Sequence, residues 1–268
     1  MNSPLLPAWS SLRCPVIGML HAPPLPGSPR FAGDMQKIRD HVRRDVDALV
    51  AGGVHGLMLE NFGDAPFFPA RVPAITVAAL TALAEVVRQH SSLPLGINVL
   101  RNDGLTALAI ARTVGASFVR VNVFTGARVT DQGVIQGIAH DLLRERAALH
   151  AADIRILADA SVKHSAPLGV ERPLRDEIAD MTSRGGADAV VISGSATGKE
   201  TSPEDVALAK AAANGRPVLV GSGVKATNVG SFLGVADALI VGTSFKRDGR
   251  PENPIEPDRV RELIRAIG

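Results

Sequence analysis

Short apolar runs alternate with longer amphipathic stretches along the whole chain, and this alternation limits the possible folds most strongly. The runs are rich in Val, Ile and Leu, as expected for parallel strands that are buried on both faces. They lie at residues 15–20, 54–59, 94–99, 118–123, 154–159, 188–193, 217–220 and 237–241. Helical patterns follow them at residues 34–52, 74–90, 104–114, 132–151, 172–185, 203–214, 225–233 and 256–267. Eight strand–helix units predict a single (β/α)8 barrel, with a doubly wound open sheet as the alternative.

The chain length suits one such domain. With 268 residues, of which 46% are hydrophobic, we expect an N-terminal extension at residues 1–14 and the barrel at residues 15–268. The 29 basic and 27 acidic residues are scattered, so the chain lacks the basic cluster that nucleic-acid binding requires. No apolar run reaches the length of a membrane span, and residues 1–13 lack a signal-peptide pattern. These features predict a cytoplasmic protein without nucleic-acid partners or a transmembrane segment.

Two similar glycine-rich turns follow the last two apolar runs. One contains Gly221, Ser222 and Gly223, and the other contains Gly242, Thr243 and Ser244. Glycine allows exposed backbone N–H groups to approach an anion closely, and the start of a following helix adds a positive dipole end. In (β/α)8 barrels the last two strand-to-helix loops often bind phosphate in this way. We therefore predict a phosphate site between residues 221–223 and 242–244.

Two carboxylates lie at the ends of predicted strands. Glu60 and Asp159 would both project toward the mouth of the barrel, where this fold places its catalytic groups. Two carboxylates that face a substrate can divide acid and base work between them. The alternative is that Glu60 or Asp159 pairs with Arg120 or Lys163 in a structural ion network. We predict acid–base use of at least one of the two.

Other polar residues at the strand ends are candidates for substrate contacts. Lys163 could bind phosphate, polarise a carbonyl or form a Schiff base, and a solvated loop lysine remains equally compatible. A buried Arg120 would require an anionic partner, either the substrate or Glu60. We predict catalytic roles for Lys163 and His164 beside the carboxylates. The predicted substrate-binding residues are His21, Asn98, Arg120, Asn122, Ser193 and Thr197.

The loop after the sixth predicted strand resembles a nucleotide-triphosphate loop but does not fulfil its pattern. Gly194 and Gly198 are separated by three residues rather than four, and Glu200 stands where Ser or Thr would hold magnesium. We expect residues 194–201 to form a lid instead. The sequence Gly221–Ala226 fits a loose dinucleotide pattern without the acidic residue that binds a ribose. No cofactor and no metal ion are expected, because metal-ligand spacings are absent.

Several of these segments together resemble the BtpA/SgcQ family. The segments are Ile17–Pro29, Glu60–Pro66, Gly96–Asp103, Arg120–Asn122, Lys163–His164, Ser193–Gly198, Gly221–Gly223 and Gly242–Gly249. The resemblance implies a phosphate-binding TIM barrel. It also implies two conflicting functions: biogenesis of photosystem I in cyanobacteria, and a role within a sugar-utilisation gene cluster, where the protein is sometimes labelled a nucleotide-hydrolysing enzyme. An assembly role does not use the strand-end groups, whereas the sugar-cluster role does.

These observations favour a metabolic enzyme that acts on a small phosphorylated compound, either a sugar phosphate or a nucleoside-derived phosphate. Proton-transfer isomerisation, lyase chemistry and hydrolysis of a glycosidic bond all fit the set of polar residues. We expect a role in carbohydrate metabolism, and a homo-oligomer is compatible with the sequence. The alternative is a non-catalytic assembly factor for a membrane complex such as photosystem I.

Overall fold

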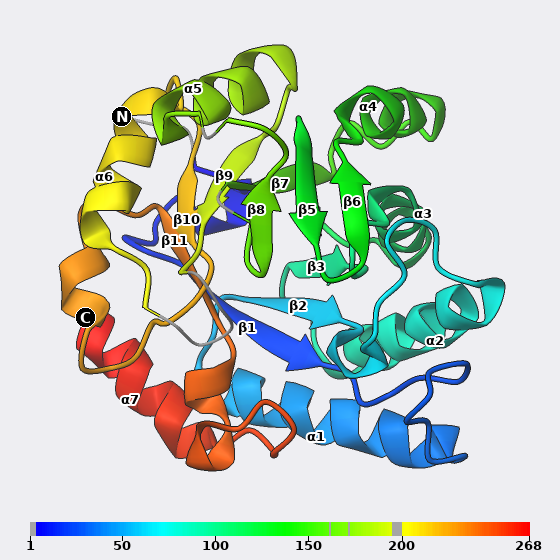
Figure 1. Cartoon of the computed structure of the whole chain (residues 1–268). Helices are drawn as coiled ribbons and strands as arrows, with labels where there is room; N and C mark the ends of the chain where they lie inside the picture. The colour runs from blue at the N-terminus through cyan, green and yellow to red at the C-terminus, as the bar shows by residue number, and fades with distance from the viewer. Residues whose placement is uncertain (1–3, 161, 171, 195–199) are drawn as a thin grey trace.

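The computed structural model describes residues 4–160, 162–170, 172–194 and 200–268. Within them, eight parallel strands close into a barrel in the order β1-β11-β10-β9-β7-β4-β3-β2 (Figure 1). Closure of the sheet confirms the (β/α)8 barrel and rules out the open sheet. The strands are β1 (Val16–His21), β2 (Gly56–Glu60), β3 (Leu95–Asn98), β4 (Phe118–Val121), β7 (Arg155–Ala160), β9 (Ala189–Ile192), β10 (Val218–Val220) and β11 (Ala238–Val241). Each one falls within or next to a predicted apolar run.

Helices form an outer ring around these strands (Figure 1). They are α1 (Met35–Gly52), α2 (Ala74–His90), α3 (Gly104–Val114), α4 (Ala139–Ala148), α5 (Leu174–Ala179), α6 (Pro203–Ala212) and α7 (Pro257–Ile267). Three of them, α1, α3 and α6, are capped at the N-terminus by a side chain. The side chains of Asp34, Asp103 and Ser202 accept hydrogen bonds from the backbone N–H three residues later.

Two of the helix predictions need correction. The helix expected at 132–151 begins only at Ala139, because residues before it form a β-hairpin that turns at residues 131–132 and continues at Gly133, where φ is +92°. The helix expected at 225–233 is a short 3-10 turn at Val229–Phe232. Asn228, Gly230 and Ser231 are weak helix formers, which accounts for the short turn. Further along, α5 ends in a π-helical turn at Asp180–Arg184.

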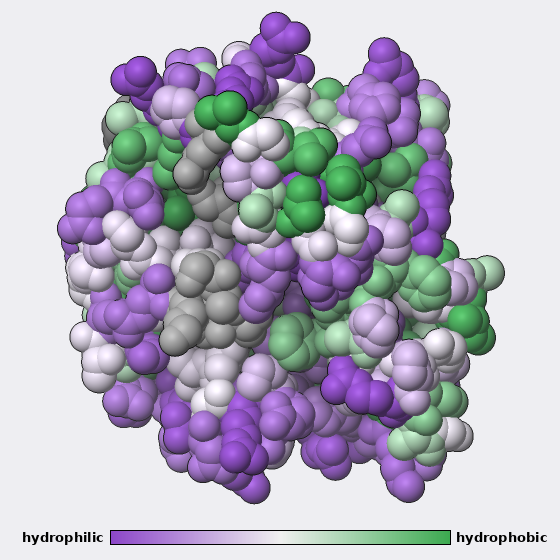
Figure 2. Space-filling view, viewed as in Figure 1, coloured by the Kyte–Doolittle hydropathy of each residue, from purple (hydrophilic) through white to green (hydrophobic). Residues whose placement is uncertain are grey.

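A small antiparallel sheet, absent from the sequence-based prediction, lies at the mouth of the barrel. It consists of β5 (Ala127–Thr130), β6 (Gly133–Gln136) and β8 (Ser165–Pro167), in the order β6-β5-β8. Figure 2 shows apolar residues gathered over this sheet, where Val129, Val134, Leu168 and Val170 are exposed. On the other side, Ile135 is buried against Val123 and Val162. The sheet therefore covers one side of the barrel mouth.

The apolar core has two layers. The larger layer lies between the strands and the outer helices, and the smaller one fills the inside of the barrel. Leu5, Leu6 and Trp9 from the N-terminal extension belong to the inner layer. The Trp9 ring meets Phe118 edge-on, with ring centroids 6.1 Å apart, and its Nε1 donates to the carbonyl of His55. The extension thus closes the barrel at the end where the strands begin, and the opposite end remains accessible.

Candidate functional site

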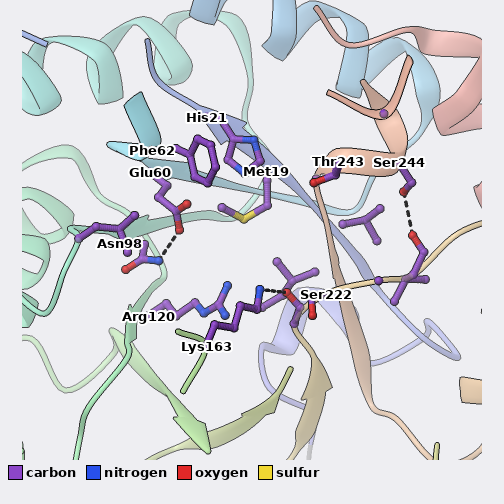
Figure 3. Close-up of a pocket in the computed structure, with 18 of the residues that line it drawn as sticks. Met19, His21, Glu60, Phe62, Asn98, Arg120, Lys163, Ser222, Thr243 and Ser244 are labelled. Carbon is purple, nitrogen blue, oxygen red and sulfur yellow. Dashed lines mark hydrogen bonds between the residues drawn. The ribbon is translucent and has the colours of Figure 1, made fainter. Parts of the chain in front are cut away.

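A cavity of about 1300 Å³ opens at the carboxyl ends of the barrel strands (Figure 3). Most of the predicted site residues line it: His21, Glu60, Asn98, Arg120, Asn122, Asp159, Lys163, His164, Gly221, Ser222, Gly223, Gly242, Thr243 and Ser244. Ser193 is buried next to it, and its Oγ lies 3.5 Å from Nη2 of Arg120. Thr197 and most of the predicted lid lie outside the described residues. The structure therefore brings residues from seven of the eight barrel strands and their following loops to one cavity.

The strand register explains why these side chains meet. His21 of β1 pairs with Glu60 of β2, Glu60 pairs with Asn98 of β3, and Asn98 pairs with Arg120 of β4. Residues that pair in adjacent parallel strands point to the same side of the sheet. Arg120 pairs with Leu157 of β7, so Asp159 lies two residues further along on the same side. The sequence places one polar residue from each of these strands in a continuous row around the mouth.

Arg120 and Asp159 form a buried ion pair. Nε of Arg120 lies 2.8 Å from Oδ1 of Asp159, and Nη2 lies 3.1 Å from Oδ2. Asn122 donates to the same carboxylate at 2.6 Å. Burial lowers the pKa of Arg120, but the Asp159 carboxylate outweighs it and the pKa is raised overall. The anionic partner of Arg120 is therefore Asp159 and not Glu60, and Asp159 takes part in the ion network described as the alternative to catalysis.

Glu60 has a different environment although it occupies a similar strand end. Its Oε2 accepts a hydrogen bond from Nδ2 of Asn98 at 2.5 Å, and its side chain is buried. Burial raises the pKa of Glu60, and the positive charges of Arg120 and Lys163 only partly oppose this. A carboxyl group with a raised pKa can donate or accept a proton near neutral pH. Of the two predicted acid–base residues, Glu60 is the one whose surroundings suit proton transfer.

Lys163 enters the cavity from the segment between β7 and β8. Its Nζ donates to the carbonyl of Gly221 at 3.3 Å, and its own carbonyl accepts a hydrogen bond from the guanidinium of Arg101. Burial, followed by the nearby charge of Arg120, lowers the pKa of Lys163 to about 8. The amine is therefore neither a solvated loop lysine nor permanently charged.

The two histidines differ in their surroundings. His21 is buried, and its ring lies against Phe62 with centroids 4.5 Å apart. Burial and the charge of Lys246 lower the pKa of His21 to about 3, so the ring is neutral at physiological pH. Among the described residues its Nδ1 has no hydrogen-bond partner. His164 is exposed at the rim of the cavity, with a φ of +52°. His21 thus offers a neutral hydrogen-bonding group inside the cavity. His164 lies at the surface of the protein, at the rim.

The two glycine-rich turns lie side by side on the side of the cavity opposite Glu60 (Figure 3). The hydroxyl of Ser244 donates to the carbonyl of Val224 at 2.8 Å and so links the turns. The N–H of Gly221 donates to Ile192 within the barrel and is not available to a ligand. Within the part of the chain that the structure describes, the N–H groups of Gly223, Val224, Thr243 and Ser244 have no protein acceptor. Phosphate binding by these turns remains a prediction.

Residues that the sequence analysis did not select also shape the site. Phe62 and Arg101 line the cavity, and Arg101 connects the loop after β3 to Lys163. Lys246 is fully buried beyond the second glycine-rich turn and pairs with Asp45 of α1. Asp45 also accepts the N–H of Ile255 at 3.0 Å. This pair fixes the segment after β11 against the outer helix layer.

Among the residues that the structure describes, no group of three or more His, Cys, Asp or Glu side chains is arranged to hold a metal ion. None of the described helices is both long enough and apolar enough to cross a lipid bilayer. The expectation that no metal and no cofactor take part remains a prediction.

Comparison with known proteins identifies relatives and structural neighbours. The photosystem I biogenesis protein BtpA of Synechocystis is 46% identical over 253 residues, which cover 94% of this chain and 88% of that protein. An uncharacterized protein of Thermococcus kodakarensis is also 46% identical and covers 94% of each chain. The structure of N-(5′-phosphoribosyl)anthranilate isomerase from Pyrococcus furiosus shares the fold, with a TM-score of 0.54, 12% identity and coverage of 95% and 98%. The model of the BtpA family matches residues 12–268, and the chain belongs to the BtpA family.

Proposed function

We propose that the protein is an enzyme that acts on a small phosphorylated metabolite by acid–base chemistry at the open end of the barrel. One observation carries this proposal. A single cavity holds the buried carboxyl group of Glu60, whose pKa is raised, and the N–H groups of two adjacent glycine-rich turns. An acid–base group and an anion site on opposite sides of one cavity are what such an enzyme requires.

The row of polar side chains around the barrel mouth suggests a role for each of its members. Glu60 is the proposed acid–base residue. Asn98 orients it through the hydrogen bond to Oε2, and the neutral ring of His21 can bind a substrate hydroxyl or carbonyl. The ion pair of Arg120 with Asp159 provides a rigid polar wall, on which Asn122 presents a buried Oδ1 without a partner among the described residues. Isomerisation, lyase chemistry and glycosidic hydrolysis all use an acid–base group of this kind.

The substrate is proposed to be a sugar phosphate or a nucleoside-derived phosphate. The name of the structural neighbour from Pyrococcus furiosus includes a phosphoribosyl group, and the two proteins share the barrel fold. At 12% identity this likeness concerns the fold alone, so it supports the choice of compounds to test and nothing finer. The cavity of about 1300 Å³ is large enough for a compound of nucleotide size.

A non-catalytic assembly role is the second candidate function. It is favoured by the name of the Synechocystis relative, which is a photosystem I biogenesis protein. The relative from Thermococcus kodakarensis is equally similar and has no such name. A pure assembly factor would have no need for a deep cavity lined with buried ionisable groups, because such groups are costly to bury. The cavity therefore favours the enzyme.

A ligand screen followed by one substitution tests the proposal. Sugar phosphates and nucleoside monophosphates are screened by thermal shift, where a ligand at 100 times its Kd stabilises by about 2.7 kcal/mol. Turnover of each stabilising compound is then measured with wild type, Glu60→Gln and Glu252→Gln, an exposed control. We expect Glu60→Gln to lower turnover by roughly 10²–10⁴-fold and the control to match wild type. Failure of every phosphorylated compound to stabilise the protein, or full activity of Glu60→Gln, would contradict the proposal.

A further inference from the structure

Lys163 carries an amine that is not neutralised by any carboxylate among the residues that the structure describes. Its Nζ contacts the carbonyl oxygen of Gly221 at 3.3 Å. The nearby carboxylate of Asp159 is occupied by Arg120 at 2.8 Å and by Asn122 at 2.6 Å. A carbonyl oxygen holds an amine in place without stabilising its charge as a carboxylate would. The amine can therefore leave this contact and react with a ligand.

The surroundings of Lys163 also favour the uncharged amine. The side chain is largely removed from water, and the positive charge of Arg120 adds to the effect of burial, so the pKa falls to about 8. At pH 7 roughly one molecule in ten then carries a neutral amine. For an ordinary lysine, which titrates near 10.4, the fraction is below about one in a thousand. Only the neutral amine is a nucleophile.

The position of Lys163 in the cavity determines what it can meet. Its amine lies beside the first glycine-rich turn, while the carboxyl group of Glu60 lies across the cavity (Figure 3). A compound whose phosphate binds the N–H groups of residues 223–224 and 243–244 would extend its carbon chain over this amine. Glu60 would then lie on the far side of the same chain.

We propose that Lys163 forms an imine with the aldehyde or ketone carbonyl of a phosphorylated substrate. This inference rests on the proposed function and narrows it to open-chain phosphorylated carbonyl compounds. The amine nitrogen attacks the carbonyl carbon, and one of its two protons moves to the carbonyl oxygen to give a neutral carbinolamine. Protonation of that hydroxyl by Glu60 expels one water molecule and leaves a protonated imine. The imine then accepts the electron pair of an adjacent C–H or C–C bond, so no oxidant or reductant is consumed.

Reductive trapping with a phosphate-bearing aldehyde tests the imine. The protein is incubated with pyridoxal 5′-phosphate at pH 7, reduced with sodium borohydride and mapped by peptide mass spectrometry. Lys225 lines the same cavity near the first turn but is exposed and paired with Glu200, so it is the matched control. We expect labelling of Lys163 to be at least tenfold faster than labelling of Lys225, and to rise with pH with a midpoint near 8. Lys163→Arg should fold normally and lose the label, and Lys225→Arg should keep it.

Two further experiments distinguish a failure of the imine from a failure of the proposed phosphate site. Inorganic phosphate should slow the labelling of Lys163, and pyridoxal without its phosphate should label it more slowly. If phosphate stabilises the protein but Lys163 reacts no faster than Lys225, the imine is refuted and the phosphate site stands. If Lys163 is labelled rapidly, but equally by both aldehydes and without protection by phosphate, the phosphate site of the proposed function is refuted instead.

Discussion

Asp159→Asn tests the role of the buried ion pair, and its effect can be estimated from the structure. The Asp159 side chain is 3% exposed and that of Arg120 is 6% exposed, so little water reaches the pair to replace the lost carboxylate. Asparagine retains one acceptor oxygen and loses the negative charge, which leaves the guanidinium buried without a counter-charge. Removal of one partner of a buried ion pair typically costs about 3–5 kcal/mol. For a domain of this size, that corresponds to a fall in Tm of roughly 6–20 °C.

The assay is thermal unfolding at pH 7, followed by circular dichroism and repeated with urea. Asp180→Asn is the control, because it breaks the exposed pair between Arg172 and Asp180 and is expected to leave Tm nearly unchanged. The double variant Arg120→Met with Asp159→Leu removes both charges and should recover much of the loss. A fall below about 3 °C for Asp159→Asn would refute the view that this carboxylate is chiefly the counter-ion of Arg120. Asp159 would then be a free carboxylate again, available for acid–base work.

Two further predictions concern Glu60 and the inner core. Burial raises the pKa of Glu60, so its contribution to stability is fully present below about pH 4 and declines as the pH rises through the raised value. Glu60→Gln, which mimics the neutral acid, should match wild type near pH 4 and be more stable in urea at pH 8; equal stability at both pH values would contradict this. Gly96→Ala should destabilise by about 1–3 kcal/mol, since the new Cβ would lie 2.0 Å from Cε2 of Phe118. Gly230→Ala, where nothing lies within 4 Å, is its control, and equal urea midpoints for the two variants would refute the packing argument.

The barrel could be predicted because its strands are buried on both faces. Such strands must be continuous apolar runs, and each run in the sequence coincides with a strand of the barrel to within two residues at either end. The prediction of secondary structure is wrong where the hydrophobic pattern of the sequence is weaker. The hairpin of β5 and β6 has a polar turn at residues 131–132, and in the sequence this turn resembles the start of a helix. Its strands are short and partly exposed, so they leave no apolar run that would distinguish them from a helical pattern.

Asp45, which the sequence analysis did not select, is nevertheless marked by its position in the sequence pattern of α1. The buried face of α1 contains Ile38, Val42, Val46 and Leu49, and Asp45 falls on the same face. A carboxylate on an apolar helix face must have a partner. Asp45 pairs with Lys246, 201 residues away, and Nε2 of His41 on the same helix lies 3.4 Å from its Oδ2. The position of Asp45 therefore predicts that some cation is buried against α1. The identity of the cation depends on the closure of the barrel, which the sequence alone does not specify.

The sequence predicts that Glu60 and Asp159 lie at the barrel mouth, but it does not predict which group each carboxylate contacts. Both lie at the end of a predicted strand and both point to the barrel mouth, so the sequence does not distinguish them as candidates. The register separates them, because Glu60 is paired with the neutral amide of Asn98, whereas the stagger between β4 and β7 brings Asp159 to the guanidinium of Arg120. One carboxyl group consequently has a raised pKa and the other serves as a counter-ion. An exchange of their neighbours, such as Asn98→Arg with Arg120→Asn, should therefore exchange the two roles, and pH titration of Glu60 in that variant would reveal it.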